Sequence, residues 1–332
     1  TDLVLHMAAE NWKDKMATKY AFLFPGQGAQ VPGMIKDLCE AYPEARKVVD
    51  DVTAITGVDM PKLLWETEQA ELSRSDNSQL AITTASLAVM KVLESKGITP
   101  SAAMGFSLGE FPALYAAGVL SYEDVIKVVR ARGLIMQSVC EKIAAENAGH
   151  APGMTAVLGL SPEAVKEVCA GIKDAYPANM NSSVQTVVSG TFDALTEVEA
   201  KAKEAGARRA IRLAVAGPYH SPLMQEAAVE FEKAIADVTF KDPTITMFSN
   251  VTGKLATSGE EIKKNAVLHL TNPVLWTTEE AVLAETMKVD GNEWKLVEPG
   301  VGQVLAGLWA KTEYNETWKC VSVNSAETVQ NI

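Results

Sequence analysis

Short apolar runs that stop at glycine or proline recur along the chain and predict buried strands entering tight loops. One run covers residues 20–24 and stops at a Pro-Gly-Gln-Gly sequence, residues 25–28. A second covers residues 102–104 and stops at Gly105. Residues 79–93 between them are rich in helix formers and end before a glycine and a proline. The order strand, helix, strand is typical of an α/β protein.

The pattern changes in the middle of the chain, where short strands alternate with helices. Strand-like runs at 154–158, 186–189 and 209–213 enclose two helix-like stretches, residues 162–169 and 193–204. This alternation predicts a small ferredoxin-like α+β subdomain.

The remaining segments return to the α/β pattern, with a predicted helix at 221–236 and predicted strands at 245–248 and 296–298. No long linker or repeat separates the parts, so we expect an insertion packed against a larger body with a cleft between them. The prediction is an α/β-hydrolase-like catalytic subdomain with an inserted ferredoxin-like one. Its boundaries are 1–18 for an N-terminal extension, 19–142 and 217–332 for the catalytic subdomain, and 143–216 for the small subdomain.

The amino-acid composition of the chain argues against some classes of binding partner. The 332 residues carry a formal charge of −12, which argues against broad binding of nucleic acid or of an anionic membrane. No apolar run approaches the length of a membrane span. The cysteines form no close pair, so neither a disulfide framework nor a zinc site is indicated, and we expect a reducing, cytoplasmic location. They are Cys39, Cys140, Cys169 and Cys320.

The turn after the second strand carries the clearest chemistry. Gly105-Phe-Ser-Leu-Gly109 has the Gly-x-Ser-x-Gly pattern of a nucleophile elbow, in which glycines permit a strained turn that exposes the serine hydroxyl. The pentapeptide alone is a weak signal, but a strand before it and a helix after it strengthen the assignment. Ser107 is therefore the candidate nucleophile, and the Leu108 amide at the start of the helix could donate to an oxyanion.

A serine hydroxyl needs a base, and the chain has four histidines. His220 lies in a turn between Gly217-Pro-Tyr and Ser-Pro, before a predicted helix, and such a turn can present an imidazole rigidly. His6 falls in the extension and His150 in a stretch rich in glycine and alanine. A structural histidine is the alternative reading of His220 from spacing alone.

Four motifs occur in the order found in malonyl-CoA:acyl carrier protein transacylases, and the chain resembles that family. The resemblance extends from about Lys19 to Trp309 and includes the strand that ends in Val-Val-Ser-Gly190. The motifs are Phe24-Pro-Gly-Gln-Gly-Ala-Gln30, Gly105-Phe-Ser-Leu-Gly-Glu110, Gly217-Pro-Tyr-His-Ser-Pro-Leu-Met224 and Glu298-Pro-Gly-Val-Gly-Gln-Val-Leu305.

The resemblance implies a role for each motif residue. Ser107 becomes the acylated nucleophile and His220 its base, while Gln27 and the Leu108 amide form the oxyanion hole. The family orients this histidine with a main-chain carbonyl, which here belongs to His269.

Arg132 matches the family arginine that binds the free carboxylate of malonate, a task suited to a planar, permanently charged group. A helix-surface charge is the alternative reading.

Two positions depart from the family: Phe106 stands where most members have histidine, and Ser183 where proline is usual. Phe106 and Tyr219 are expected to line the acyl pocket, with Tyr219 favouring malonyl over branched extender units.

The predicted activity is transfer of malonyl from malonyl-CoA to the phosphopantetheine thiol of acyl carrier protein, through a malonyl-Ser107 ester in a ping-pong mechanism. No metal or other cofactor is expected, and family members are usually monomeric. Fatty acid synthesis is the favoured setting. The alternatives are a free-standing polyketide acyltransferase, an acyl hydrolase or editing thioesterase, and a non-catalytic protein that binds carrier protein.

Carrier proteins are acidic, so this acidic chain must dock them through a local basic patch. The inserted subdomain offers such a patch, although an ordinary solvated charged face explains it equally well. Its residues are Lys201, Lys203, Arg208, Arg209 and Arg212.

Overall fold

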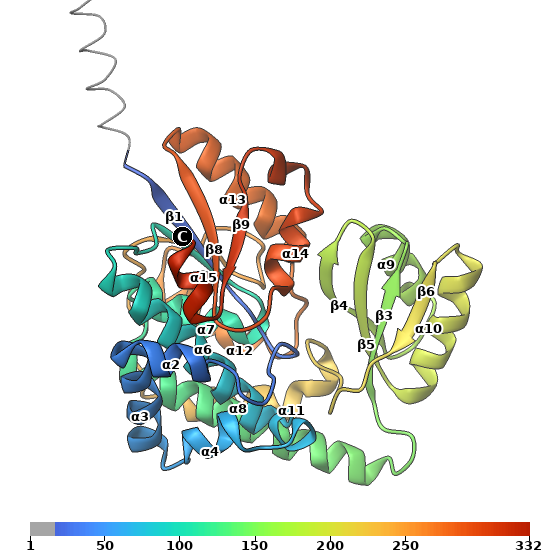
Figure 1. Ribbon diagram of the computed structural model, residues 1–332. Coiled ribbons are helices and arrows are strands. Elements are labelled where there is room, and N and C mark those ends of the chain that lie inside the picture. The colour runs from blue at the N-terminus through green and yellow to red at the C-terminus, as the bar shows by residue number, and fades with distance from the viewer. Residues whose placement is uncertain (1–16) are drawn as a thin grey trace, which may run out of the picture.

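The computed structural model describes residues 17–332 and shows a larger body beside a smaller sheet with its own helices (Figure 1). The predicted extension, residues 1–18, lies outside the described residues except for Ala17 and Thr18. A parallel sheet in the order β7-β2-β1-β8-β9 forms the centre of the body. Its strands are β1 (Lys19–Phe24), β2 (Ala102–Gly105), β7 (Thr246–Met247), β8 (Trp294–Pro299) and β9 (Cys320–Val323).

Helices pack against this sheet, and α6 (Ser75–Ser95) is buried along most of its length against α3, α7 and α8. Small residues such as Ala81, Ala85 and Ala88 let it lie deep in the core. The other helices of the body are α2 (Lys36–Ala41), α3 (Pro43–Thr56), α4 (Met60–Trp65), α5 (Gln69–Leu72), α7 (Glu110–Ala116), α8 (Tyr122–Glu146), α11 (Gln225–Ala234), α12 (Gly259–Leu268), α13 (Trp276–Asp290), α14 (Val304–Ala310) and α15 (Ala326–Gln330).

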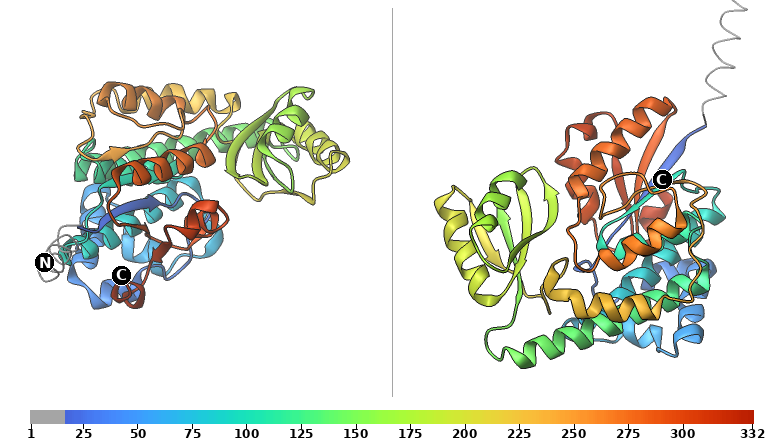
Figure 2. Two further views of the ribbon diagram at one scale, coloured as in Figure 1. Left: turned by 90° about the horizontal axis from the view of Figure 1, so that it is seen from above. Right: turned by 180° about the vertical axis from the view of Figure 1, so that it is seen from behind.

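The smaller sheet is antiparallel, in the order β4-β5-β3-β6, and two helices pack on it with a separate apolar core (Figure 2). Its connectivity is strand, helix, strand, strand, helix, strand, which is the ferredoxin-like arrangement. The predicted fold class is therefore confirmed. The elements are β3 (Gly153–Leu158), α9 (Pro162–Ala170), β4 (Ala175–Ser182), β5 (Gln185–Gly190), α10 (Phe192–Glu204) and β6 (Arg209–Arg212).

Two strands were not predicted from the hydrophobic pattern. β4 contains Pro177, Asn179 and Asn181, residue types that strands usually exclude, and its pairing with β5 shifts register twice. β9 is a short edge strand with only Val323 buried. The helix predicted at 221–236 begins instead as a 3₁₀ turn, Pro222–Met224, before α11. Within residues 17–332, no helix is both long enough and apolar enough to cross a membrane.

Two backbone hydrogen bonds join the small sheet to the body. Met180 N–H donates to the Val274 carbonyl at 3.0 Å, and Val274 N–H donates to the Ala178 carbonyl at 2.7 Å. β4 thus meets the segment that follows α12 and precedes α13. The cleft between the two parts is bordered by β4 on one side and by the ends of β1 and β2 on the other.

Candidate active site

Ser107 lies between β2 and α7, in a turn that only small neighbours allow. Its φ of 54° is in the left-handed region, which a side chain occupies at a cost. A Cβ on Gly105 would lie 2.0 Å from the Gly109 carbonyl oxygen, and a Cβ on Gly109 would lie 2.1 Å from the Phe24 carbonyl oxygen. The glycines are therefore required by the close approach of the elbow to itself and to the end of β1.

His220 stands directly against this serine. The Ser107 Oγ and His220 Nε2 atoms are 2.8 Å apart, and His220 Nδ1 lies 2.7 Å from the His269 main-chain carbonyl oxygen. Because a carbonyl only accepts, Nδ1 carries the proton and Nε2 is free to accept one from the serine. Burial lowers the pKa of His220 to about 4, although the hydrogen bond to the His269 carbonyl favours the charged form. The imidazole is thus a neutral base at pH 7.

The predicted oxyanion donors flank the serine. Gln27 lines the same cavity as Ser107, and its side-chain Nε2 donates to Ser78 Oγ at 2.9 Å. Among the described residues, its backbone N–H has no hydrogen-bond partner. Leu108 follows the serine in the 3₁₀ turn Ser107–Gly109, and its side chain is fully buried. The Gln27 N–H is available to an oxygen at the serine.

Arg132 is buried and is not among the side chains that line the cavity. The surface alternative is therefore wrong, since only 1% of Arg132 is exposed. Its Nη1 donates to Gln79 Oε1 at 2.8 Å, while Nε and Nη2 have no partner among the described residues. Burial lowers the pKa of Arg132 to about 10, so it is charged at pH 7. Gln79 Nε2 in turn contacts Oε1 of Gln27 at 3.5 Å, and Gln27 lines the cavity.

The cavity itself has a volume of about 340 Å³ and is bordered by both subdomains. Asn179 and Asn181 of β4 line it, and the Oδ1 atom of each is buried without a hydrogen-bond partner among residues 17–332. Sequence reasoning missed both residues because the strand that carries them, β4, was itself not predicted. The amide oxygens themselves are buried, so a ligand in the cavity that donates N–H or O–H groups would pair with them after a small side-chain rotation.

Phe106 and Tyr219 also line this cavity. The Phe106 ring packs edge-on against Trp276, with ring centroids 5.3 Å apart. The Tyr219 hydroxyl is 2.7 Å from Ser75 Oγ, and burial raises its pKa well above the ordinary value. The contacts with Trp276 and Ser75 thus fix the positions of both aromatic side chains, which narrow the space beside Ser107.

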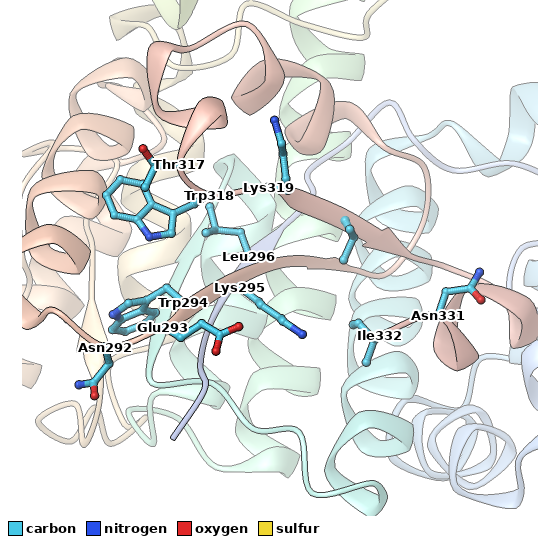
Figure 3. A pocket seen from close by; sticks show the side chains of 11 residues that line it. Asn292, Glu293, Trp294, Lys295, Leu296, Thr317, Trp318, Lys319, Asn331 and Ile332 are labelled. Atoms are coloured by element: carbon cyan, nitrogen blue, oxygen red, sulfur yellow. The ribbon is translucent and has the colours of Figure 1, made fainter. Parts of the chain in front are cut away.

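A larger hollow of about 440 Å³ lies at the opposite end of the sheet, near the starts of β1 and β8. Figure 3 shows Trp294, Trp318 and Lys295 around it. Its lining residues include no serine paired with a histidine, in contrast to the cavity around Ser107. In residues 17–332, no group of three or more His, Cys, Asp or Glu side chains is arranged to hold a metal ion.

The predicted basic patch is partly neutralised. Lys201 pairs with Glu197 at 2.8 Å, and Arg212 pairs with Glu199 at 2.8 Å. Arg208 and Arg209 make no such ion pair within the described part of the chain.

A model of the acyl transferase domain matches residues 21–291 of the chain. The malonyl CoA-acyl carrier protein transacylase of Bacillus subtilis is 36% identical over 320 residues, which cover 94% of this chain and 96% of that protein. The protein of the same name from Escherichia coli K12 is 36% identical over 295 residues, covering 88% and 92%.

Solved structures of similar proteins share the fold. An acyl carrier protein S-malonyltransferase from Vibrio cholerae superposes with a TM-score of 0.85 at 34% identity, covering 95% of this chain and 99% of that one. A malonyl-transacylase in complex with a type II PKS acyl-carrier protein superposes with a TM-score of 0.83 at 32% identity, covering 95% and 98%.

Proposed function

Because the chain belongs to the acyl transferase family, and within it to the malonyl CoA-acyl carrier protein transacylases, we propose that it transfers malonyl through an ester on Ser107. The donor is malonyl-CoA and the acceptor is the phosphopantetheine thiol of acyl carrier protein. The observation that carries this proposal is the 2.8 Å contact between Ser107 Oγ and a neutral His220 inside a cavity shared by both subdomains.

Acylation begins when the serine hydroxyl attacks the thioester carbonyl. His220 Nε2 takes the hydroxyl proton, and the charge that develops on the carbonyl oxygen is met by the Gln27 and Leu108 amides. The tetrahedral intermediate collapses with loss of the CoA thiolate, which receives the proton from His220. The carrier thiol then repeats the sequence on the malonyl ester, which gives a ping-pong mechanism with no metal or other cofactor.

Selection of malonyl is assigned to Arg132, with Phe106 and Tyr219 limiting bulk beside the serine. Gln79 links the guanidinium to Gln27, which lines the cavity, and its contact with Gln27 is long at 3.5 Å and therefore weak. We propose that the malonyl carboxylate displaces this contact when it binds the guanidinium. Arg132 Nε and Nη2 would then gain a charged acceptor.

The two unpaired amide oxygens of Asn179 and Asn181 are suited to the N–H groups of the pantetheine arm, which CoA and carrier protein share. Arg208 and Arg209 belong to the predicted basic patch and make no ion pair among residues 17–332, and we assign them to an acidic carrier protein. A cytoplasmic location, a monomeric state and a role in fatty acid rather than polyketide synthesis stay predictions.

The experiment is intact-mass analysis of the protein mixed with malonyl-CoA, followed by addition of holo acyl carrier protein. We expect a malonyl adduct that transfers to the carrier, that is lost in Ser107→Ala, and that persists in the exposed-serine control Ser138→Ala. An adduct discharged to water alone would favour the hydrolase. Binding of carrier protein with no adduct would favour the non-catalytic alternative.

A further inference from the structure

Asn250 follows β7 and lies fully buried behind the nucleophile elbow, where its side chain makes four hydrogen bonds. Its Oδ1 accepts from the Ser107 backbone N–H at 2.8 Å and lies 2.9 Å from His269 Nε2. Its Nδ2 donates to the Gly105 carbonyl at 2.7 Å and to Glu279 Oε2 at 2.8 Å. Every donor and lone pair of the amide is thus used, and none of these contacts follows from the family motifs.

The orientation of the Asn250 amide is fixed by neighbouring groups that can only donate or only accept a hydrogen bond. The Ser107 backbone N–H can only donate, and the Gly105 carbonyl can only accept, so Oδ1 must face the serine. His269 Nε2 must then be the atom that carries the imidazole proton. His220 has the opposite tautomer, because its Nδ1 donates to the His269 carbonyl.

Asn250 is therefore linked to both members of the catalytic pair, directly to Ser107 and through His269 to His220. The Asn250 amide holds two backbone groups of the elbow, whose serine has a positive φ of 54°. Through the His269 imidazole it also holds the residue whose carbonyl orients His220. Glu110 completes the link, since its Oε1 accepts from the Asn250 backbone N–H at 2.8 Å.

We propose that the Asn250 amide and the His269 imidazole form a positioning bridge that sets the separation of the Ser107 hydroxyl and the His220 imidazole. The proposal rests on the function proposed above, because the rate it affects is acylation of Ser107. His269 thus contributes its side chain as well as its carbonyl.

His269→Leu removes the Nε2 donor but keeps the main-chain carbonyl, and His269→Gln restores a side-chain donor. Because a misplacement of about 1 Å can cost roughly 100-fold in rate, we expect acylation by malonyl-CoA to fall roughly 10- to 100-fold in the leucine variant. The KM should stay within about twofold, since no substrate contact is removed, and His269→Gln should recover most of kcat. The exposed histidine variant His150→Leu is the control.

A serine-directed fluorophosphonate separates this proposal from the proposed function, because it reports the reactivity of Ser107 without malonyl. If the wild type reacts with it but does not take malonyl, the transferase function fails while the bridge is still tested by the labelling rates. Equal labelling of wild type and a folded His269→Leu variant would overturn the bridge. So would a glutamine variant as slow as the leucine variant.

A measurement on the unmodified protein removes dependence on variant folding. Nitrogen-15 NMR of labelled histidine should show His269 as a neutral imidazole protonated at Nε2 and His220 as one protonated at Nδ1. A neutral His269 protonated only at Nδ1 would contradict the bridge, because its Nε2 could then not donate to Asn250.

Discussion

Replacing Arg132 with glutamine should have opposite effects on malonyl transfer and on the stability of the free protein. The guanidinium is buried, and its Nε and Nη2 have no hydrogen-bond partner within the described part of the chain. A hydrogen bond to a charged group contributes about 1.5–3 kcal/mol, so two such bonds to a malonyl carboxylate contribute at least about 3 kcal/mol. At about 1.4 kcal/mol per tenfold, Arg132→Gln should lower kcat/KM for malonyl-CoA by a factor of roughly 100 to 1,000.

The same substitution should stabilise the empty protein. Burial lowers the pKa of Arg132 from 12.5 to about 10, and at about 1.36 kcal/mol per pH unit the charge costs about 3 kcal/mol to bury. Arg132→Gln removes that cost, so the midpoint of thermal unfolding should rise while malonyl transfer falls.

The assay compares kcat/KM for malonyl-CoA and acetyl-CoA, because acetyl has no free carboxylate and should lose little. Arg130→Gln is the matched control, since Arg130 lies on the same helix, partly exposed, and bonds only the Asp76 carbonyl. An unchanged malonyl to acetyl ratio in Arg132→Gln would refute the assignment. A loss of both activities together with a lower unfolding midpoint would show a structural role instead.

Two further predictions concern pH. Burial lowers the pKa of the His220 base to about 4, so kcat/KM for acylation should fall only as the pH drops through about 4. A decrease in kcat/KM centred near pH 6.5 would contradict the buried environment of His220. Burial raises the pKa of Glu280 from 4.5 to about 8, so its contribution to stability is present below pH 4.5 and lost as the pH rises to 8. Between pH 4.5 and pH 8, the unfolding free energy of Glu280→Gln should therefore rise relative to that of the wild type, by up to roughly 5 kcal/mol, as measured by urea titration. An equal difference between variant and wild type at pH 5 and at pH 9 would refute this prediction.

Much of the fold could be predicted from the sequence because apolar runs and glycines act locally. The elbow around Ser107 needs a strand, a tight turn and a helix in direct succession, and all three leave local signals. β4 could not be predicted in the same way, since Pro177 and Asn179 suppress the strand pattern and the strand forms only by pairing with β5 and Val274.

The residues of the candidate site also differ in whether a local sequence pattern marks them. Ser107 and His220 lie in motifs, whereas Asn250 and Glu279 carry no local mark of their role. Their contacts join segments 143 and 29 residues apart, which depend on how distant loops pack behind the sheet. The burial of Arg132 behind Gln79 is likewise a property of the packed core.

The pair of backbone hydrogen bonds between β4 and Val274 has a mechanical consequence. Val274 lies five residues after His269, so the inserted sheet is tied to the segment that aligns the catalytic base. Swinging the sheet away as a hinged lid would break both bonds and leave buried backbone groups unpaired. The two bonds therefore oppose a widening of the entrance to Ser107 by movement of the inserted sheet.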